Sequence, residues 1–259
     1  MRFTPNRNRR NSAHCSRKNS ANVTAAGIDL LDANHILHFL DVVDAFGHVS
    51  VRNPANSSQF LMSYAIAPAQ TTSQHIVTYA INNATAVGLT FNTSVRYIHS
   101  EIYKKFPTVL AVVHTHTQEI LPFANQASVP FLSQMHTSPA VGDVGVPIFD
   151  IRALTTSILP TTALHDLLVR NEAMGDALAA KFVTSSQHLR GHGMAVRSGS
   201  VREVVFNSYY VKQDATVQLQ GFPARRFPRA WSLWVKQVDN DPLYTNDLRN
   251  KAPPAATGF

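Results

Sequence analysis

Apolar residues recur every three to four positions in four stretches of the chain, which is the spacing of a helix with one buried face. We therefore predict helices over 27–43, 92–106, 158–182 and 200–221. Pro107 directly follows the second stretch and Gly221 ends the fourth, and both residues are typical of helix termini.

Between these helices, apolar and polar residues alternate, as in strands with one buried face. The clearest case is DAFGHVSVRNP, in which Phe46, His48, Ser50 and Arg52 share one side. Further strands are predicted over 59–68, 75–83, 87–91, 108–116 and 185–196. The turn-forming NPANSS between the first two strands predicts a hairpin. The pattern therefore predicts an α/β fold in which helices flank an antiparallel sheet.

Two histidines end the apolar strand predicted over 108–116. Because side chains alternate along a strand, His114 and His116 would point the same way, with Cα atoms about 6.6 Å apart. This spacing lets both rings reach one ion, although two unrelated polar residues at a strand end would give the same pattern.

A third histidine, His192, lies between Gly191 and Gly193. Glycines permit unusual backbone angles or the close approach of a neighbouring group. A histidine presented in this way could complete a three-histidine site with an open position, which is typical of catalytic zinc and also suits iron, cobalt or manganese. Spacing alone leaves open whether His192 meets the other two histidines.

Composition limits the chemistry. The chain has 259 residues, of which 44% are hydrophobic, so it can bury a sizeable core. Its single cysteine is Cys15, near the N-terminus. The predicted folded part therefore has no thiol, which excludes disulfides, thiolate catalysis and sulfur-bound zinc there. Any metal must be held by nitrogen and oxygen ligands.

The formal net charge of +7 comes almost entirely from the N-terminal segment. Its first 24 residues contain no acidic side chain and these basic ones: Arg2, Arg7, Arg9, Arg10, Arg17 and Lys18. A polar segment of this composition cannot bury enough apolar surface to order itself. We therefore predict a disordered basic tail over 1–26, a folded domain over 27–245 and a flexible tip over 246–259.

No stretch approaches the roughly 20 apolar residues that cross a bilayer, and the N-terminus lacks the apolar core of a secretory signal. We expect a cytoplasmic protein without a membrane or nucleic-acid partner. The Arg- and Ser-rich tail leaves an organelle-targeting peptide open, although its Asn and Pro residues suit an amphipathic helix poorly.

Four segments, in this order, resemble the class II aldolase/adducin family: DAFGHVSVRNP, RYIHSEIYKKFPTVLAVVHTHTQEILPFA, VGVPIFDIR and LRGHGMAV. The resemblance extends over about residues 29–244. It implies an α/β/α sandwich around a mostly antiparallel sheet, assembled as a homotetramer with active sites between subunits. Members of the family include sugar-phosphate aldolases and epimerases, a pyridine-carboxylate decarboxylase, non-haem iron oxygenases and non-enzymatic adducin heads.

The resemblance implies that His114, His116 and His192 bind a divalent ion. Zinc is the ion that we expect first, and iron, manganese or cobalt would suit the same ligands. The family's general acid/base glutamate lies four residues before the histidine of the IHSEIY helix, and Val95 occupies that position here. Ordinary aldol cleavage would therefore lose its usual proton carrier.

The missing glutamate leaves three alternatives. Decarboxylation needs mainly an electron sink, which a metal ion can supply, and its proton can come from water. Three neutral imidazoles could instead hold Fe(II) for an oxygenase. The third alternative is a catalytically inactive scaffold.

Three further residues are candidates for substrate contact. His48 replaces the asparagine of the phosphate cradle found in sugar-phosphate members, as in the decarboxylase-like branch, so we expect His48 and Arg52 to grip a carboxylate. A turn-capping role for His48 and a surface position for Arg52 are the alternatives. His136 lies in a loop that the family places over the active site.

Two glutamates could replace the missing base. Glu101 lies two residues after His99 on the predicted helix, so it faces another way and a structural role is favoured. Glu119 follows the histidine pair closely enough to be a candidate. His99 itself is expected to pack against the sheet.

The sequence thus predicts a metal-dependent C–C lyase. Its reaction would be decarboxylation or retro-aldol cleavage of a carboxylated or carbonyl-bearing small molecule, in a secondary-metabolite or aromatic pathway. The ordered set of motifs carries this expectation.

Overall fold

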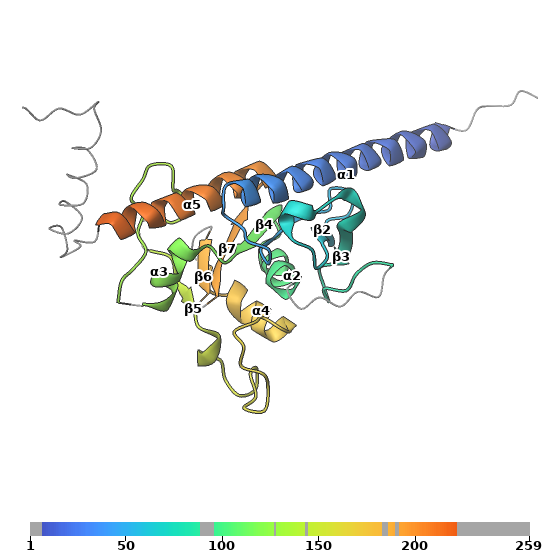
Figure 1. Ribbon diagram of the computed structural model, residues 1–259. Helices are drawn as coiled ribbons and strands as arrows, with labels where there is room; N and C mark the ends of the chain where they lie inside the picture. The colour runs from blue at the N-terminus through green and yellow to red at the C-terminus, as the bar shows by residue number, and fades with distance from the viewer. Residues whose placement is uncertain are drawn as a thin grey trace, which may run out of the picture. The chain divides into compact units, whose positions relative to one another are not determined.

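The computed structural model describes residues 7–88, 96–126, 128–142, 145–182, 186–189 and 192–221 (Figure 1). Its centre is a seven-stranded sheet with the order β3-β2-β1-β4-β7-β6-β5. The strands are β1 His48–Arg52, β2 Gln59–Ser63, β3 Ile76–Ala80, β4 Ala111–Thr115, β5 Ile148–Phe149, β6 Ser186–Leu189 and β7 Gly193–Ser198. Neighbouring strands are antiparallel except for the parallel pair β5 and β6. The predicted antiparallel pattern is confirmed.

Helices cover both faces of this sheet. They are α1 Arg7–Phe39, α2 Arg96–Lys105, α3 Leu121–Asn125, α4 Glu172–Ala179 and α5 Val201–Gly221. One apolar cluster joins α1 and α5 to the face that carries Val113, and a second joins α2 and α4 to the face that carries Val112. Because neighbours on a strand point to opposite faces, a strand buried on both sides reads as a continuous apolar run. The α/β/α sandwich is therefore confirmed.

Helix α1 begins well before its packed part. Leu30 and Leu37 are fully buried against the sheet, yet the helix starts at Arg7. Residues 7–26, for which the sequence predicts disorder, are thus helical in the structure. They contain neither glycine nor proline, so a helix nucleated by the packed turns can extend at low cost per residue. Residues 1–6 and the predicted tip 246–259 lie outside the described residues.

The helix predicted over 158–182 is wrong for most of its length, since α4 spans only Glu172–Ala179. The side chain of Asp166 accepts a hydrogen bond from the Leu168 amide and pairs with Arg170, which holds a turn. Asn171 then caps α4 by accepting from the Met174 amide. Leu159 and Val169, which precede this cap, are still buried. The apolar spacing of this segment therefore resembled that of a helix, although the segment is not helical.

The pairing of three strands brings three distant histidine-bearing segments to one end of the sheet. His48 on β1 lies directly opposite His114 on β4. On the other side of β4, Thr115 lies opposite Met194 of β7, two residues after His192. In the described part of the chain, no helix is long and apolar enough to cross a bilayer.

Candidate metal centre

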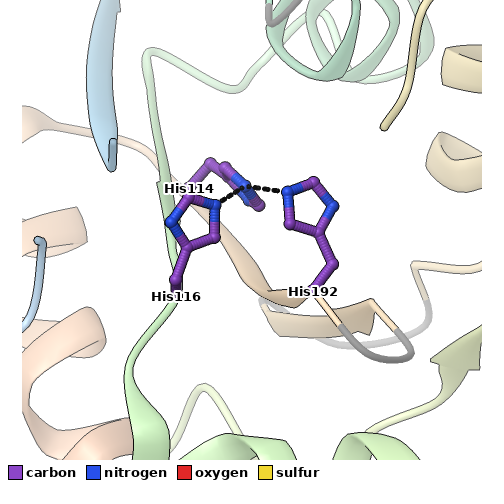
Figure 2. A group of neighbouring side chains, drawn as sticks. All are labelled: His114, His116 and His192. Carbon is purple, nitrogen blue, oxygen red and sulfur yellow. Dashed lines mark hydrogen bonds between the residues drawn. The ribbon is translucent and has the colours of Figure 1, made fainter. Parts of the chain in front are cut away.

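The two histidines of the β4 strand point to the same side of the sheet, as their spacing predicts. His114 is buried within the strand and His116 follows its last residue. Their Nε2 atoms are 3.0 Å apart, and Figure 2 shows the His116 ring directed toward the ring of His114. The two rings could therefore bind the same metal ion.

His192 joins this pair from the turn between β6 and β7 (Figure 2). Its Nε2 atom lies 3.3 Å from Nε2 of His114, and the potential ligand atoms of all three residues lie within 4.8 Å of one another. Gly193 makes this approach possible because a Cβ there would lie 2.0 Å from the Thr115 carbonyl oxygen. The structure thus brings together the three histidines whose meeting spacing alone left open.

Hydrogen bonds fix the orientation of two of the rings. Nδ1 of His114 donates to the Met194 carbonyl at 3.0 Å, and Nδ1 of His116 donates to the Asp44 carboxylate at 3.1 Å. In neutral rings these bonds use the single ring proton, so both Nε2 atoms carry a lone pair. Two lone pairs facing each other at this distance repel unless a cation lies between them. The donor set therefore fits a divalent metal ion.

Burial keeps the rings of His114 and His192 neutral. Removal from water, followed by the neighbouring His192 ring, lowers the pKa of His114 well below its ordinary value. Removal from water, followed by His116, lowers the pKa of His192 to about 4. Since only a neutral imidazole can donate a lone pair to a metal, this environment prepares both residues as ligands.

Asp44 was not recognised from the sequence as part of the site. Partial burial acts to raise its pKa, but the amides of Phe46 and Gly47, together with His116, hold that pKa below its ordinary value. A carboxylate therefore orients the His116 ring. Its position four residues before His48 in DAFGHVS was the only available signal.

Replacing Asp44 with asparagine is expected to weaken zinc binding by about 10–100-fold, because the amide can still cap the turn but no longer carries the charge that orients His116. Competition with a chelator of known affinity measures this loss. Asp29→Asn is the matched control, since Asp29 pairs with Arg202 on the surface. Equal zinc affinity in Asp44→Asn and the unaltered protein would contradict this role for Asp44.

His48 stands beside the three ligands, on the same face of the sheet. Its ring centroid lies 4.9 Å from that of His114, and its Nδ1 lies 2.6 Å from Nε2 of His99. His99 in turn contacts Ser50, whose hydroxyl also contacts Tyr103. His48 therefore lies next to the candidate ligand His114 and is held by His99 of α2, and its role in gripping a substrate anion stays a prediction.

Burial makes His99 a source of acid sensitivity. Its pKa is lowered to about 3 from an ordinary value of 6.5, because the ring is removed from water. The unfolded chain binds this proton below pH 6.5 and the folded chain only near pH 3, so folding stability should fall as the pH drops through that window. The slope attributable to His99 is at most about 1.4 kcal/mol per pH unit.

Urea unfolding of the chelator-treated protein at pH 7 and pH 5 measures this slope. His99→Gln should flatten it, whereas His38→Gln, on an exposed position of α1, should leave it unchanged. Identical slopes for all three proteins would contradict the assignment of acid sensitivity to His99.

The prediction that Arg52 grips a substrate anion is wrong. Its guanidinium donates to the backbone carbonyls of four residues: Ser57, Tyr103, Phe106 and Val109. It lies at the opposite end of β1 from His48, about 13 Å away along the strand. Arg52 therefore ties β1 to the end of α2.

His136 is exposed in a turn whose backbone is bonded to α5, since the amides of Gln134 and Met135 donate to Asp214. Within the described residues, no hydrogen bond or ion pair joins His136 to the three ligands. A role for His136 stays a prediction.

Both candidate glutamates have hydrogen-bond or ion-pair partners other than the three histidines. Glu101 accepts a hydrogen bond from the Ser100 hydroxyl and forms an ion pair with Lys104. These contacts agree with the structural role that the sequence favoured for Glu101. Glu119 accepts from the Thr117 hydroxyl and approaches Lys212 of α5 at 3.7 Å. Both carboxylates are engaged in holding the fold.

Residues 28–219 match the sequence profile described as Class II Aldolase and Adducin N-terminal domain. The chain belongs to the class II aldolase and adducin family. Val95, which the resemblance sets at the position of the family's glutamate, lies outside the described residues.

Three similar proteins are informative. The chain is 32% identical to the decarboxylase tropJ of Talaromyces stipitatus, over 82% of this chain and 93% of that protein. It is 27% identical to the 3,4-dihydroxyphthalate decarboxylase of a Terrabacter species, over 48% of this chain and 47% of that protein. An aldolase II superfamily protein from Pseudomonas syringae superposes with a TM-score of 0.61 at 20% identity, covering 85% and 88% of the two chains. The solved structure supports the fold.

Proposed function

We propose that this protein is a metal-dependent decarboxylase that acts on a small carboxylated substrate, in particular a hydroxylated aromatic acid. The observation that carries the proposal is the convergence of three Nε2 atoms, two of which belong to rings whose protons are already donated elsewhere. Two relatives described as decarboxylases, one of them for 3,4-dihydroxyphthalate, support this reaction over retro-aldol cleavage.

His114, His116 and His192 would hold the ion, and zinc is the ion that we propose. When bound, such an ion supplies a positive charge that stabilises negative charge developing on a substrate oxygen. His48 offers a buried Nε2 atom that has no hydrogen-bond partner in the described part of the chain. This atom can bind an oxygen of the substrate beside the ion.

The rest of the centre excludes water and fixes the rings. His48, His99 and His114 are all buried, and low polarity strengthens every electrostatic contact made there. Because Glu101 and Glu119 are engaged by other side chains, the proton that replaces the lost carboxylate is expected to come from solvent. By resemblance to the family, we further propose a homotetramer.

Metal analysis followed by an anaerobic assay tests this function. We expect about one zinc per chain and CO₂ release from 3,4-dihydroxyphthalate or another hydroxylated aromatic acid in a panel, lost on chelation and restored by zinc. Oxygen consumption without anaerobic CO₂ release would replace the proposal with an oxygenase. Absence of bound metal would favour a scaffold.

A further inference from the structure

A chain of four buried side chains leads from the helix layer to the metal centre. Tyr103 and His99 lie on α2, and Ser50 and His48 lie on β1. The consecutive contacts are 2.8 Å from Tyr103 Oη to Ser50 Oγ, 2.6 Å from Ser50 Oγ to His99 Nδ1, and 2.6 Å from His99 Nε2 to His48 Nδ1. All four residues are at least nine-tenths buried, so the chain forms one connected polar path within an apolar layer.

The direction of these hydrogen bonds follows from the end at Tyr103. We assign Tyr103 as the donor, because the opposite direction would leave a buried phenol proton unpaired, and Ser50 Oγ is the one hydrogen-bond partner that the described residues give it. The Ser50 hydroxyl, having accepted from Tyr103, has its own proton left for Nδ1 of His99. The remaining proton of neutral His99 is then on Nε2 and is donated to Nδ1 of His48.

The last link sets the state of His48. Since its Nδ1 accepts a hydrogen bond, the single proton of the neutral ring must be on Nε2. That atom is buried and has no partner among the described residues, and the ring lies directly across the strand pair from His114. His48 therefore presents an N–H group, and not a lone pair, to the space beside the three metal ligands.

We propose that Tyr103, Ser50 and His99 are positioning residues that keep His48 as a permanent hydrogen-bond donor, which selects substrates carrying an anionic oxygen next to the atom bound by the metal. This inference rests on the proposed function for its substrate class. It assigns to His48 the anion contact that Arg52 cannot make. A substrate with a cation or only a hydrogen-bond donor next to His48 would leave the Nε2 proton without an acceptor, and this substrate would bind more weakly.

Nitrogen NMR of ¹⁵N-histidine-labelled, zinc-loaded protein reads the tautomer directly. We expect the His48 signal to show a proton on Nε2, and a His48→Gln sample assigns that signal. Ser50→Ala should remove the preference of His48 for a proton on Nε2 and give a mixture of both tautomers. Ser50→Thr keeps the hydroxyl and should therefore keep the Nε2-protonated tautomer. Ser208→Ala is the matched control, since Ser208 is an equally buried serine that donates to the Val204 carbonyl.

Binding of phthalate, a dicarboxylate with no hydroxyl groups, gives a second readout that needs no turnover. Calorimetry should show phthalate bound about tenfold more weakly by Ser50→Ala than by the unaltered protein or Ser208→Ala. A wild-type His48 with a bare Nε2 would overturn the proposal, as would unchanged tautomer and affinity in Ser50→Ala. If no acid releases CO₂ but the tautomer is as expected, the proposed function fails while the donor role of His48 stands.

Discussion

Replacing His114 with alanine should abolish stable zinc binding and reduce CO₂ release by at least about 10²–10³-fold. His114 is the central member of the three candidate ligands, because its Nε2 lies 3.0 Å from that of His116 and 3.3 Å from that of His192. Without it, the other two rings form an incomplete ligand set. Loss of the several kcal/mol that a metal ion contributes to charge stabilisation corresponds to a rate effect of this size.

Metal analysis after dialysis, together with initial rates at saturating substrate, measures both effects of His114→Ala. His38→Ala is the matched control, because His38 is exposed on α1 and should keep full zinc content and rate. Full activity of His114→Ala after removal of metal would show that the reaction does not depend on this centre.

Replacing Gly193 with alanine should destabilise the folded protein by about 3 kcal/mol or more and should also remove the metal site. The residue has a φ of 149°, which L side chains rarely adopt. An added Cβ would also lie 2.0 Å from the Thr115 carbonyl oxygen and 3.0 Å from Cα of His116. Relief of this overlap requires β7 and the His192 turn to move away from β4, so stability and zinc affinity fall together.

Urea unfolding of the chelator-treated protein separates the stability loss from the loss of zinc. Gly27→Ala is the matched control: Gly27 lies in α1 with open space around its Cα, so alanine there should be neutral or stabilise by up to about 1 kcal/mol. A Gly193→Ala protein that unfolds at the same urea concentration as the original would show that the close contact relaxes at little cost.

The strands were the easier part of the fold to predict. Alternation in β1 and the apolar run of β4 both predicted strands correctly. A strand covered by helices on both faces carries apolar side chains on both faces, and this pattern is visible in the sequence. The prediction of a helix over 158–182 failed because apolar residues that are buried outside a helix happened to recur at helical spacing. Leu159 and Val169 are buried from turns, and the Asx-type contacts of Asp166 and the cap at Asn171 decided where α4 begins.

The same distinction separates His48 from Arg52. Alternation placed both residues on one face of β1, but it carries no information about what lies opposite each position. His48 faces the histidine centre because β1 pairs with β4 in the register that sets it against His114. Arg52, at the far end of the strand, donates hydrogen bonds to backbone carbonyls at the end of α2.

By itself, the sequence predicted the fold class and named His114, His116 and His192 as candidate metal ligands, because strand periodicity, glycine flanks and the order of the motifs are local properties of the chain. Only the tertiary structure decided which groups orient those ligands. Asp44, the Met194 carbonyl and the path from Tyr103 to His48 become neighbours through strand register and helix packing. Such contacts between distant segments leave no periodic signal in a single sequence.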